Sequence, residues 1–159
     1  MNSNILKETL FWKIVWILVL VSWCVFIFSN SIQTAEKSSA RSNGVVEIVE
    51  KTVEKMNLDV EITDHGVRKS AHFFEFYVLG TILSLNCLIW KKHTDIRLVL
   101  TAFFGLIIAL TDETLQLLSN GRSCSVTDVW LDFSAVVLSH LFFYIAFVII
   151  KCKINRKSL

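Results

Sequence analysis

Four long apolar runs, separated by polar segments, constrain this chain more than any other feature. They cover about residues 10–28, 70–90, 98–118 and 128–150, and each approaches the roughly 20 residues that a helix needs to cross a bilayer. Hydrophobic residues make up 53% of the 159 residues, which is more than a soluble domain of this size normally contains. We therefore predict an all-α integral membrane protein, in which residues 1–159 form a single domain built as a four-transmembrane-helix bundle.

The first apolar run has two interpretations. Lys7 and Lys13 precede or enter it, as basic residues do in a secretory signal peptide. The run is long, however, and no small-residue cleavage pattern follows it in FSNSIQ. We expect an uncleaved transmembrane helix with Trp12 and Trp16 near one interface.

A polar segment of mixed charge, residues 29–69, connects the first two runs. Within it, apolar residues recur at roughly helical spacing, with charged residues between them: Val45, Val46, Ile48, Val49, Val53 and Met56. The pattern predicts a short amphipathic helix that begins near Ser42 and Asn43. Such a helix either rests on the bilayer or covers the bundle, and a solvated helical linker is an equal alternative.

The distribution of basic residues predicts the orientation. In a four-span arrangement, one side collects Lys7, Lys13, Lys91, Lys92, Arg97, Lys151, Lys153, Arg156 and Lys157. Because basic residues favour the cytoplasmic side, we place both termini and the 91–97 loop in the cytoplasm. Segment 29–69 and the 119–127 loop are then extracytoplasmic.

Several classes of function receive no support. The basic residues form no block or stripe of the kind that binds nucleic acid. The cysteines lie in or beside apolar runs or in a loop, without metal-binding or disulfide spacing: Cys24, Cys87, Cys124 and Cys152. No cofactor motif is present, so the bilayer itself is the one partner predicted from composition. We predict neither a cofactor nor a metal, and the oligomeric state is left open.

Polar residues cluster at one end of the predicted bundle. Thr63 or Asp64 is expected to cap the second helix, and the Asn120-Gly121 turn to follow the third. The predicted spans then bring together, at the outer leaflet, Lys69, His72, Glu75, Asp112, Glu113, Gln116, Arg122, Ser125, Asp128 and Asp132. Small residues lie beneath them at the four-residue spacing that lets membrane helices approach closely: Gly80 and Ser84, Gly105 and Ala109, Ala135 and Ser139. The polar faces should therefore point into the bundle.

The acids in this cluster outnumber its lysine and arginine. Charged groups within a bilayer are costly, so either some carboxyls are protonated or a cation or basic group completes the site. His72 and Glu75, at i and i+3, suit a metal or acid–base pair, with a structural hydrogen bond as the competing interpretation. His140 lies too deep along its helix to join them easily, and the HExxH signature is absent.

The remaining polar residues also have alternative interpretations. Asp112, Glu113 and Gln116 serve either as interhelical hydrogen-bonding groups or as functional groups. Arg122 forms a salt bridge with Asp128 or Glu113, or else binds an anionic head group such as phosphate. Asp128, after Ser125, also suits the cap and first turn of the last helix.

Two segments resemble a known family. RKSAHFFEFYVLG, from Arg68 to Gly80, and DETLQLLSNGRSCSVTDVWLD, from Asp112 to Asp132, are similar to the VanZ-like family of small bacterial membrane proteins. The matching positions are Lys69, His72, Glu75, Glu113, Gln116, Arg122, Ser125 and Asp128. The resemblance implies a cell-envelope protein linked to glycopeptide resistance, chiefly to teicoplanin, and it implies no particular reaction.

The residues and the resemblance together lead to one main hypothesis. An outward-facing polar pocket binds an amphiphile, either a lipid-linked envelope intermediate or a glycopeptide with its lipid tail. The alternative is a membrane-embedded hydrolase or transferase that acts on a lipid-linked substrate through His72 and carboxylates. A transporter is less well supported, because the chain contains no internal repeat.

Overall fold

The computed structural model describes residues 3–34, 36–40, 43–46, 63–90, 93–122 and 124–157. Its long helices are α1 (Ser3–Ser31), α3 (Asp64–Ile89), α4 (Thr94–Gln116) and α5 (Val126–Lys157). Each contains a stretch long and apolar enough to cross a membrane: Leu10–Ser31, Asp64–Ile89, Ile96–Gln116 and Val126–Ile154. The predicted all-helical fold, with four helices long and apolar enough to cross a membrane, is thereby confirmed for the described residues.

Local sequence accounts for where these helices begin and end. Thr63 caps α3, because its hydroxyl accepts a hydrogen bond from the backbone N–H of Gly66 at 3.1 Å. α4 ends at Gln116, two residues before the predicted limit, where backbone bonds of the i to i−3 type tighten the chain into a turn. Gly121 then adopts φ 79°, a left-handed conformation that favours glycine. α5 continues to Lys157, beyond the predicted limit at residue 150 and through a group of basic residues.

The predicted amphipathic helix lies largely outside the described residues. Residues 36–40 and 43–46 are helical. Most of the apolar positions that suggested the helix fall beyond residue 46, so its extent and its placement on the membrane remain predictions.

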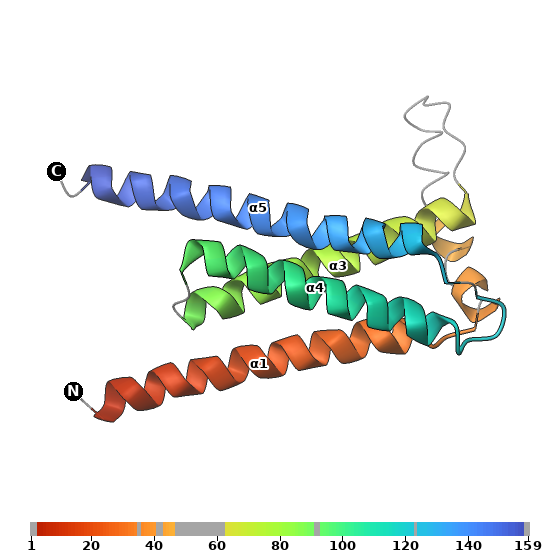
Figure 1. Ribbon diagram of the computed structural model, residues 1–159, viewed down its shortest axis with the longest axis horizontal. Helices are drawn as coiled ribbons and strands as arrows, with labels where there is room; N and C mark the ends of the chain where they lie inside the picture. The colour runs from red at the N-terminus through yellow and green to blue at the C-terminus, as the bar shows by residue number, and fades with distance from the viewer. Residues whose placement is uncertain are drawn as a thin grey trace.

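The four helices pack in a simple order. α3 and α4 lie in the middle and each contacts both α1 and α5, which flank them on opposite sides (Figure 1). Both ends of the chain lie at one end of the bundle, called here the terminal end. At the opposite end, called here the polar end, α1 and α4 finish and α3 and α5 begin. An even number of crossings places both termini on the same side of a membrane.

Small residues bring α3 and α4 close to α5. A Cβ atom added at Gly80 of α3 would lie 2.7 Å from the carbonyl oxygen of Val136 in α5. One added at Gly105 of α4 would lie 2.6 Å from the Val136 Cγ1. Ala109 and Ala135 are fully buried in the same core. The close approach expected from the small-residue spacing is confirmed.

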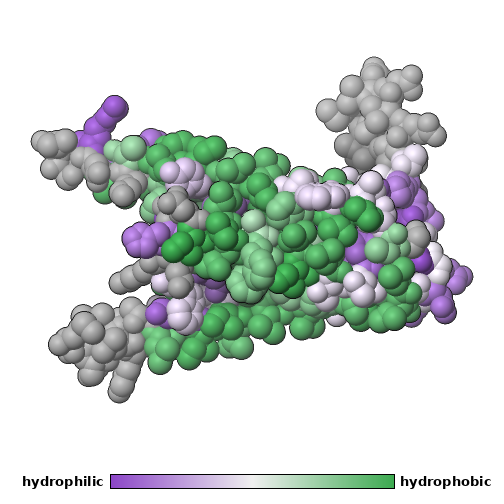
Figure 2. Space-filling model, in the orientation of Figure 1, coloured by the Kyte–Doolittle hydropathy of each residue, from purple (hydrophilic) through white to green (hydrophobic). Residues whose placement is uncertain are grey.

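The outer surface of the helices is apolar. Hydrophobic side chains cover the middle of the molecule, whereas hydrophilic residues gather at the polar end (Figure 2). Exposed residues such as Phe142, Val99 and Phe103 would be unfavourable in water and are suited to lipid. The bundle therefore buries polar groups between its helices while it presents apolar groups to the membrane.

Candidate functional site

A cavity of about 160 Å³ opens at the polar end of the bundle. Its lining combines basic, acidic and amide side chains with a glycine and a leucine: His65, Arg68, Lys69, His72, Glu113, Gln116, Gly121, Arg122, Asp128, Leu131 and Asp132. Seven of the residues predicted from sequence thus share this lining, and they come from α3, α4, α5 and the loop after α4.

Three predicted residues lie outside the lining, and several lining residues were not predicted. Asp112 lies deeper in the bundle, Glu75 contacts α1, and Ser125 contributes its backbone N–H to Glu113 at 3.0 Å. His65 and Arg68 were missed as site residues. His65, Lys69 and His72 follow i, i+4, i+7 spacing, so helical periodicity could have placed His65 on the same face as the two predicted residues.

Basic side chains form one part of the lining. The Lys69 Nζ lies 2.7 Å from Asp128 Oδ1, and this ion pair joins α3 to α5. Arg68 pairs with Asp64 at 3.4 Å within α3. Arg122 donates from Nη1 to the backbone carbonyl of Ser31 at 3.3 Å. Among the described residues, Arg122 makes no ion pair with a carboxylate. Of its two interpretations, the salt bridge to Asp128 or Glu113 is therefore wrong, because Asp128 pairs with Lys69 and Glu113 bonds to the Ser125 N–H.

The electrostatic setting of Arg122 follows from its position. Burial and the neighbouring positive charge of Arg68 lower the pKa of Arg122 from its ordinary value, against the opposing effect of Asp112. A guanidinium group still remains charged at neutral pH, because arginine is effectively always protonated in proteins. The site therefore holds a partly buried positive charge that a bound anion would stabilise.

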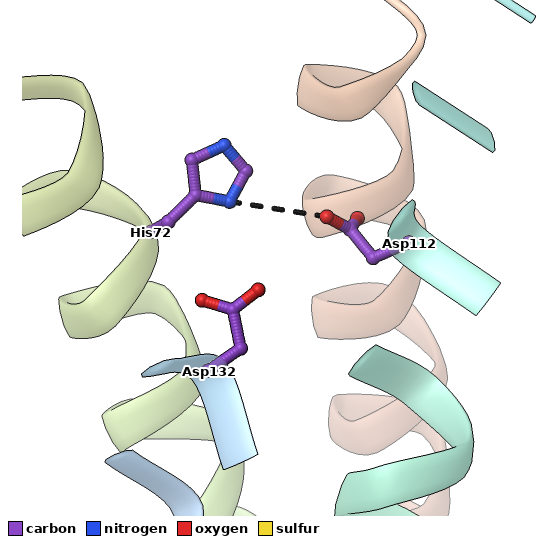
Figure 3. Close-up of side chains that lie close together, drawn as sticks. All are labelled: His72, Asp112 and Asp132. Carbon is purple, nitrogen blue, oxygen red and sulfur yellow. Dashed lines mark ion pairs between the residues drawn. The ribbon is translucent and has the colours of Figure 1, made fainter. Parts of the chain in front are cut away.

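Buried acids and His72 form the deepest part of the site. Asp112 is fully buried and accepts hydrogen bonds from Ser31 Oγ at 2.5 Å and from Gln116 Nε2 at 3.1 Å. The His72 Nδ1 lies 3.8 Å from Asp112 Oδ2 (Figure 3). The Asp132 carboxylate, from α5, lies close to both (Figure 3). Helices α3, α4 and α5 thus each contribute one side chain to this group of His72, Asp112 and Asp132.

This arrangement corrects the predicted pairing of His72 with Glu75. The Glu75 Oε1 accepts a hydrogen bond from Asn30 Nδ2 of α1 at 2.9 Å, and the Glu75 carbonyl accepts one from Trp23 Nε1 at 3.1 Å. His72 instead faces Asp112 and Asp132. Residues at i and i+3 are close on a helix, but α3 lies between two neighbouring helices, so the two side chains serve different interfaces.

Glu113 connects the site to the loop that closes it. Its carboxylate accepts the backbone N–H of Ser125 at 3.0 Å and also a hydrogen bond from Cys124. Glu113 is 2% exposed, so its carboxylate oxygens face these two donors and the cavity rather than bulk solvent. Glu113 thus ties the loop between α4 and α5 to α4, while Arg122 of the same loop bonds to α1.

His140 stays apart from the site. It lies in the middle of α5, where its Nδ1 is 2.8 Å from the hydroxyl of Ser84 in α3. Thr81 and Ser139 bond in the same region at 2.7 Å. These pairs join α3 to α5 within the membrane-crossing part of the bundle, as interhelical hydrogen bonds do in other membrane proteins.

Comparison with known proteins gives a match to one family. The model of the VanZ/LLP1 family matches residues 16–148. These residues include α3, α4 and the cavity described above. Neither the curated proteins nor the solved structures contain a match.

Proposed function

This chain belongs to the VanZ/LLP1 family of membrane proteins, and on that premise we propose that its polar cavity binds the anionic head group of an amphiphile at the outer face of a bacterial membrane. The ligand is a lipid-linked envelope intermediate or a glycopeptide that carries a lipid tail. The expected phenotype is reduced susceptibility to teicoplanin. A multi-pass protein of the cell envelope is well placed for that role.

Arg122 is the observation that carries this proposal. Its guanidinium group lines the cavity and is partly buried, and it forms no ion pair with any carboxylate that the structure describes. Arg68 lines the same cavity and repels it. A phosphate or carboxylate between the two would be held by charge-assisted hydrogen bonds, which are among the strongest that proteins form.

The surface near the cavity supports an amphiphile in preference to a free anion. Three large apolar residues near this end are exposed. Leu118, which follows α4, is 78% exposed, and Val126 and Trp130, in the first turns of α5, are 71% and 61% exposed. Tryptophan at the end of a membrane helix favours the head-group region of the bilayer. A ligand with its head group in the cavity would therefore place its tail against apolar side chains and lipid.

Binding is tested with the purified full-length chain in lipid nanodiscs that contain an anionic polyprenyl phosphate lipid. We expect Arg122→Gln to bind this lipid about 10- to 100-fold more weakly, since a hydrogen bond to a charged group contributes about 1.5–3 kcal/mol. Arg122→Lys keeps the charge and should lose less. The matched control is Arg156→Gln, an exposed arginine at the terminal end.

The phenotype needs its own measurement. Cells that lack the protein are complemented with wild type, Arg122→Gln or Arg156→Gln at equal membrane levels, and their teicoplanin susceptibility is compared. We expect protection from wild type and Arg156→Gln and a loss of protection with Arg122→Gln. Equal protection by all three would contradict the role of Arg122 in the phenotype.

A second candidate, a hydrolase or transferase for a lipid-linked substrate, is favoured by a different observation. His72 and the carboxylates of Asp112 and Asp132 lie together at the base of the cavity, where a histidine is suited to transfer a proton to or from a bound substrate. Turnover of lipid-linked substrates by the purified protein, abolished in His72→Gln, would support this class. Binding without turnover would favour the first.

A further inference from the structure

The carboxylate of Asp132 is buried without a partner in the described part of the chain. Asp132 is 2% exposed and lines the cavity, yet no described residue donates a hydrogen bond to it or forms an ion pair with it. An ionised carboxylate in such a place is strongly disfavoured unless a cation or hydrogen-bond donors compensate for the lost water. Asp132 therefore needs either a proton or a bound cation.

Its neighbours have the chemistry of metal ligands. One ligand atom from each of His72, Asp112 and Asp132 lies within 4.8 Å of the others, and the carboxylate of Asp132 points toward the His72–Asp112 pair (Figure 3). Ligand atoms that surround Zn²⁺ tetrahedrally at about 2.0–2.2 Å are about 3.3–3.6 Å apart. The 3.8 Å between His72 Nδ1 and Asp112 Oδ2 is close to that value. Small side-chain rotations would bring all three ligand atoms within bonding distance of one ion.

The distance between His72 and Asp112 is poorly suited to a shared proton. A separation of 3.8 Å between His72 Nδ1 and Asp112 Oδ2 is too long for a hydrogen bond. The His72 Nδ1 is buried and has no hydrogen-bond partner among the described residues. Ser31 and Gln116 meanwhile donate to the two oxygens of Asp112, as outer partners orient the carboxylates of metal sites.

We propose that His72, Asp112 and Asp132 bind one divalent metal ion, of the Zn²⁺ or Mn²⁺ type, at the base of the cavity. An imidazole with two carboxylates suits these ions, and the two negative charges would balance the charge of the ion. Three protein ligands leave at least one position open toward the cavity, as in metal sites that bind water or substrate. This site does not depend on whether Arg122 binds an anion.

The test is metal binding by the full-length protein in detergent, after treatment with a chelator. Zn²⁺ or Mn²⁺ alone is added, and binding is followed by calorimetry and by the thermal unfolding midpoint. We expect one ion per chain and a higher midpoint. His72→Gln and Asp132→Asn should each weaken binding by at least about 100-fold, since even the loss of an outer partner costs 10- to 100-fold.

His93→Gln is the matched control, because His93 is an exposed histidine before α4, and it should bind as wild type does. Since the two ligand variants change different helices, misfolding of one leaves the other informative, and the unfolding midpoint of each metal-free variant reports its folding. The proposal is overturned by the absence of stoichiometric binding of either ion, by undiminished binding in both ligand variants, or by loss of binding in His93→Gln.

Discussion

The ion pair between Lys69 and Asp128 links α3 directly to α5 at the polar end. The two charged atoms are 2.7 Å apart, and the side chains are 38% and 28% exposed. Exposure of this degree lets water and ions screen the pair. The interaction therefore orients both side chains at the cavity more than it stabilises the fold.

A double-mutant cycle of Lys69→Gln and Asp128→Asn tests this at the level of the residue pair. We expect a coupling energy of about 0.5 kcal/mol in low salt, in keeping with other exposed pairs, and a smaller value at about 1 M salt, where the screening length falls to about 3 Å. The measurement is the free energy of unfolding in detergent. A coupling above about 2 kcal/mol, unchanged by salt, would show that the pair behaves as a buried one.

At the scale of helices, α3 occupies the central place and contacts each of α1, α4 and α5. It carries the cavity residues on its first turns and Gly80 where it crosses α5. Four of the cavity residues and the close approach to Val136 thus lie on one helix. A change at the crossing should therefore also shift His72 and Lys69 relative to the acids of α4 and α5.

The two central glycines should respond differently to an added methyl group. In Gly80→Ala the new Cβ would meet the Val136 backbone, at 2.7 Å from its oxygen and 2.9 Å from its Cα, whereas in Gly105→Ala it would meet the Val136 side chain. Overpacking typically costs about 1–3 kcal/mol, and we expect both variants to lower the unfolding midpoint. Val136→Ala as a second substitution should largely restore Gly105→Ala and leave Gly80→Ala destabilised. Equal rescue of both would contradict the backbone contact at Gly80.

Considered as a whole, the molecule has two chemically different ends. The polar end holds the cavity, whereas at the terminal end cations lie over aromatic rings: Lys13 over Trp90 at 4.5 Å and Arg97 over Phe147 at 5.5 Å. Such aromatic and basic residues favour a membrane interface. If the terminal end is cytoplasmic, as the basic residues predict, the cavity opens on the outer side.

Thiol labelling of intact cells tests this orientation. In a chain whose other cysteines are replaced, Cys124 at the polar end should react with a membrane-impermeant maleimide, whereas a cysteine introduced as Arg156→Cys should react only after the cells are permeabilised. Desolvation and the hydrogen bond with Glu113 raise the pKa of Cys124, so less thiolate is present at neutral pH and labelling should accelerate as the pH rises. The opposite pattern of labelling would invert the predicted topology.

Sequence alone predicted the helical fold, the four apolar segments, a helix cap at Thr63 or Asp64 and the close approach at Gly80 and Gly105. Each of these depends on local composition or on the spacing of residues within one helix, which tertiary contacts do not change. It also identified which polar residues need an explanation, because a charge in an apolar chain is unfavourable wherever that chain folds.

The tertiary structure alone decided which polar residues are neighbours. Periodicity defines a helical face, but the rotation of each helix about its axis relative to the others depends on packing, here of Gly80 and Gly105 against Val136. In that packing, Glu75 bonds to Asn30, and Asp128 pairs with Lys69 instead of Arg122. It also places His72, Asp112 and Asp132 close together. Residues 40 and 20 positions apart in the sequence become neighbours because three helices converge at the polar end.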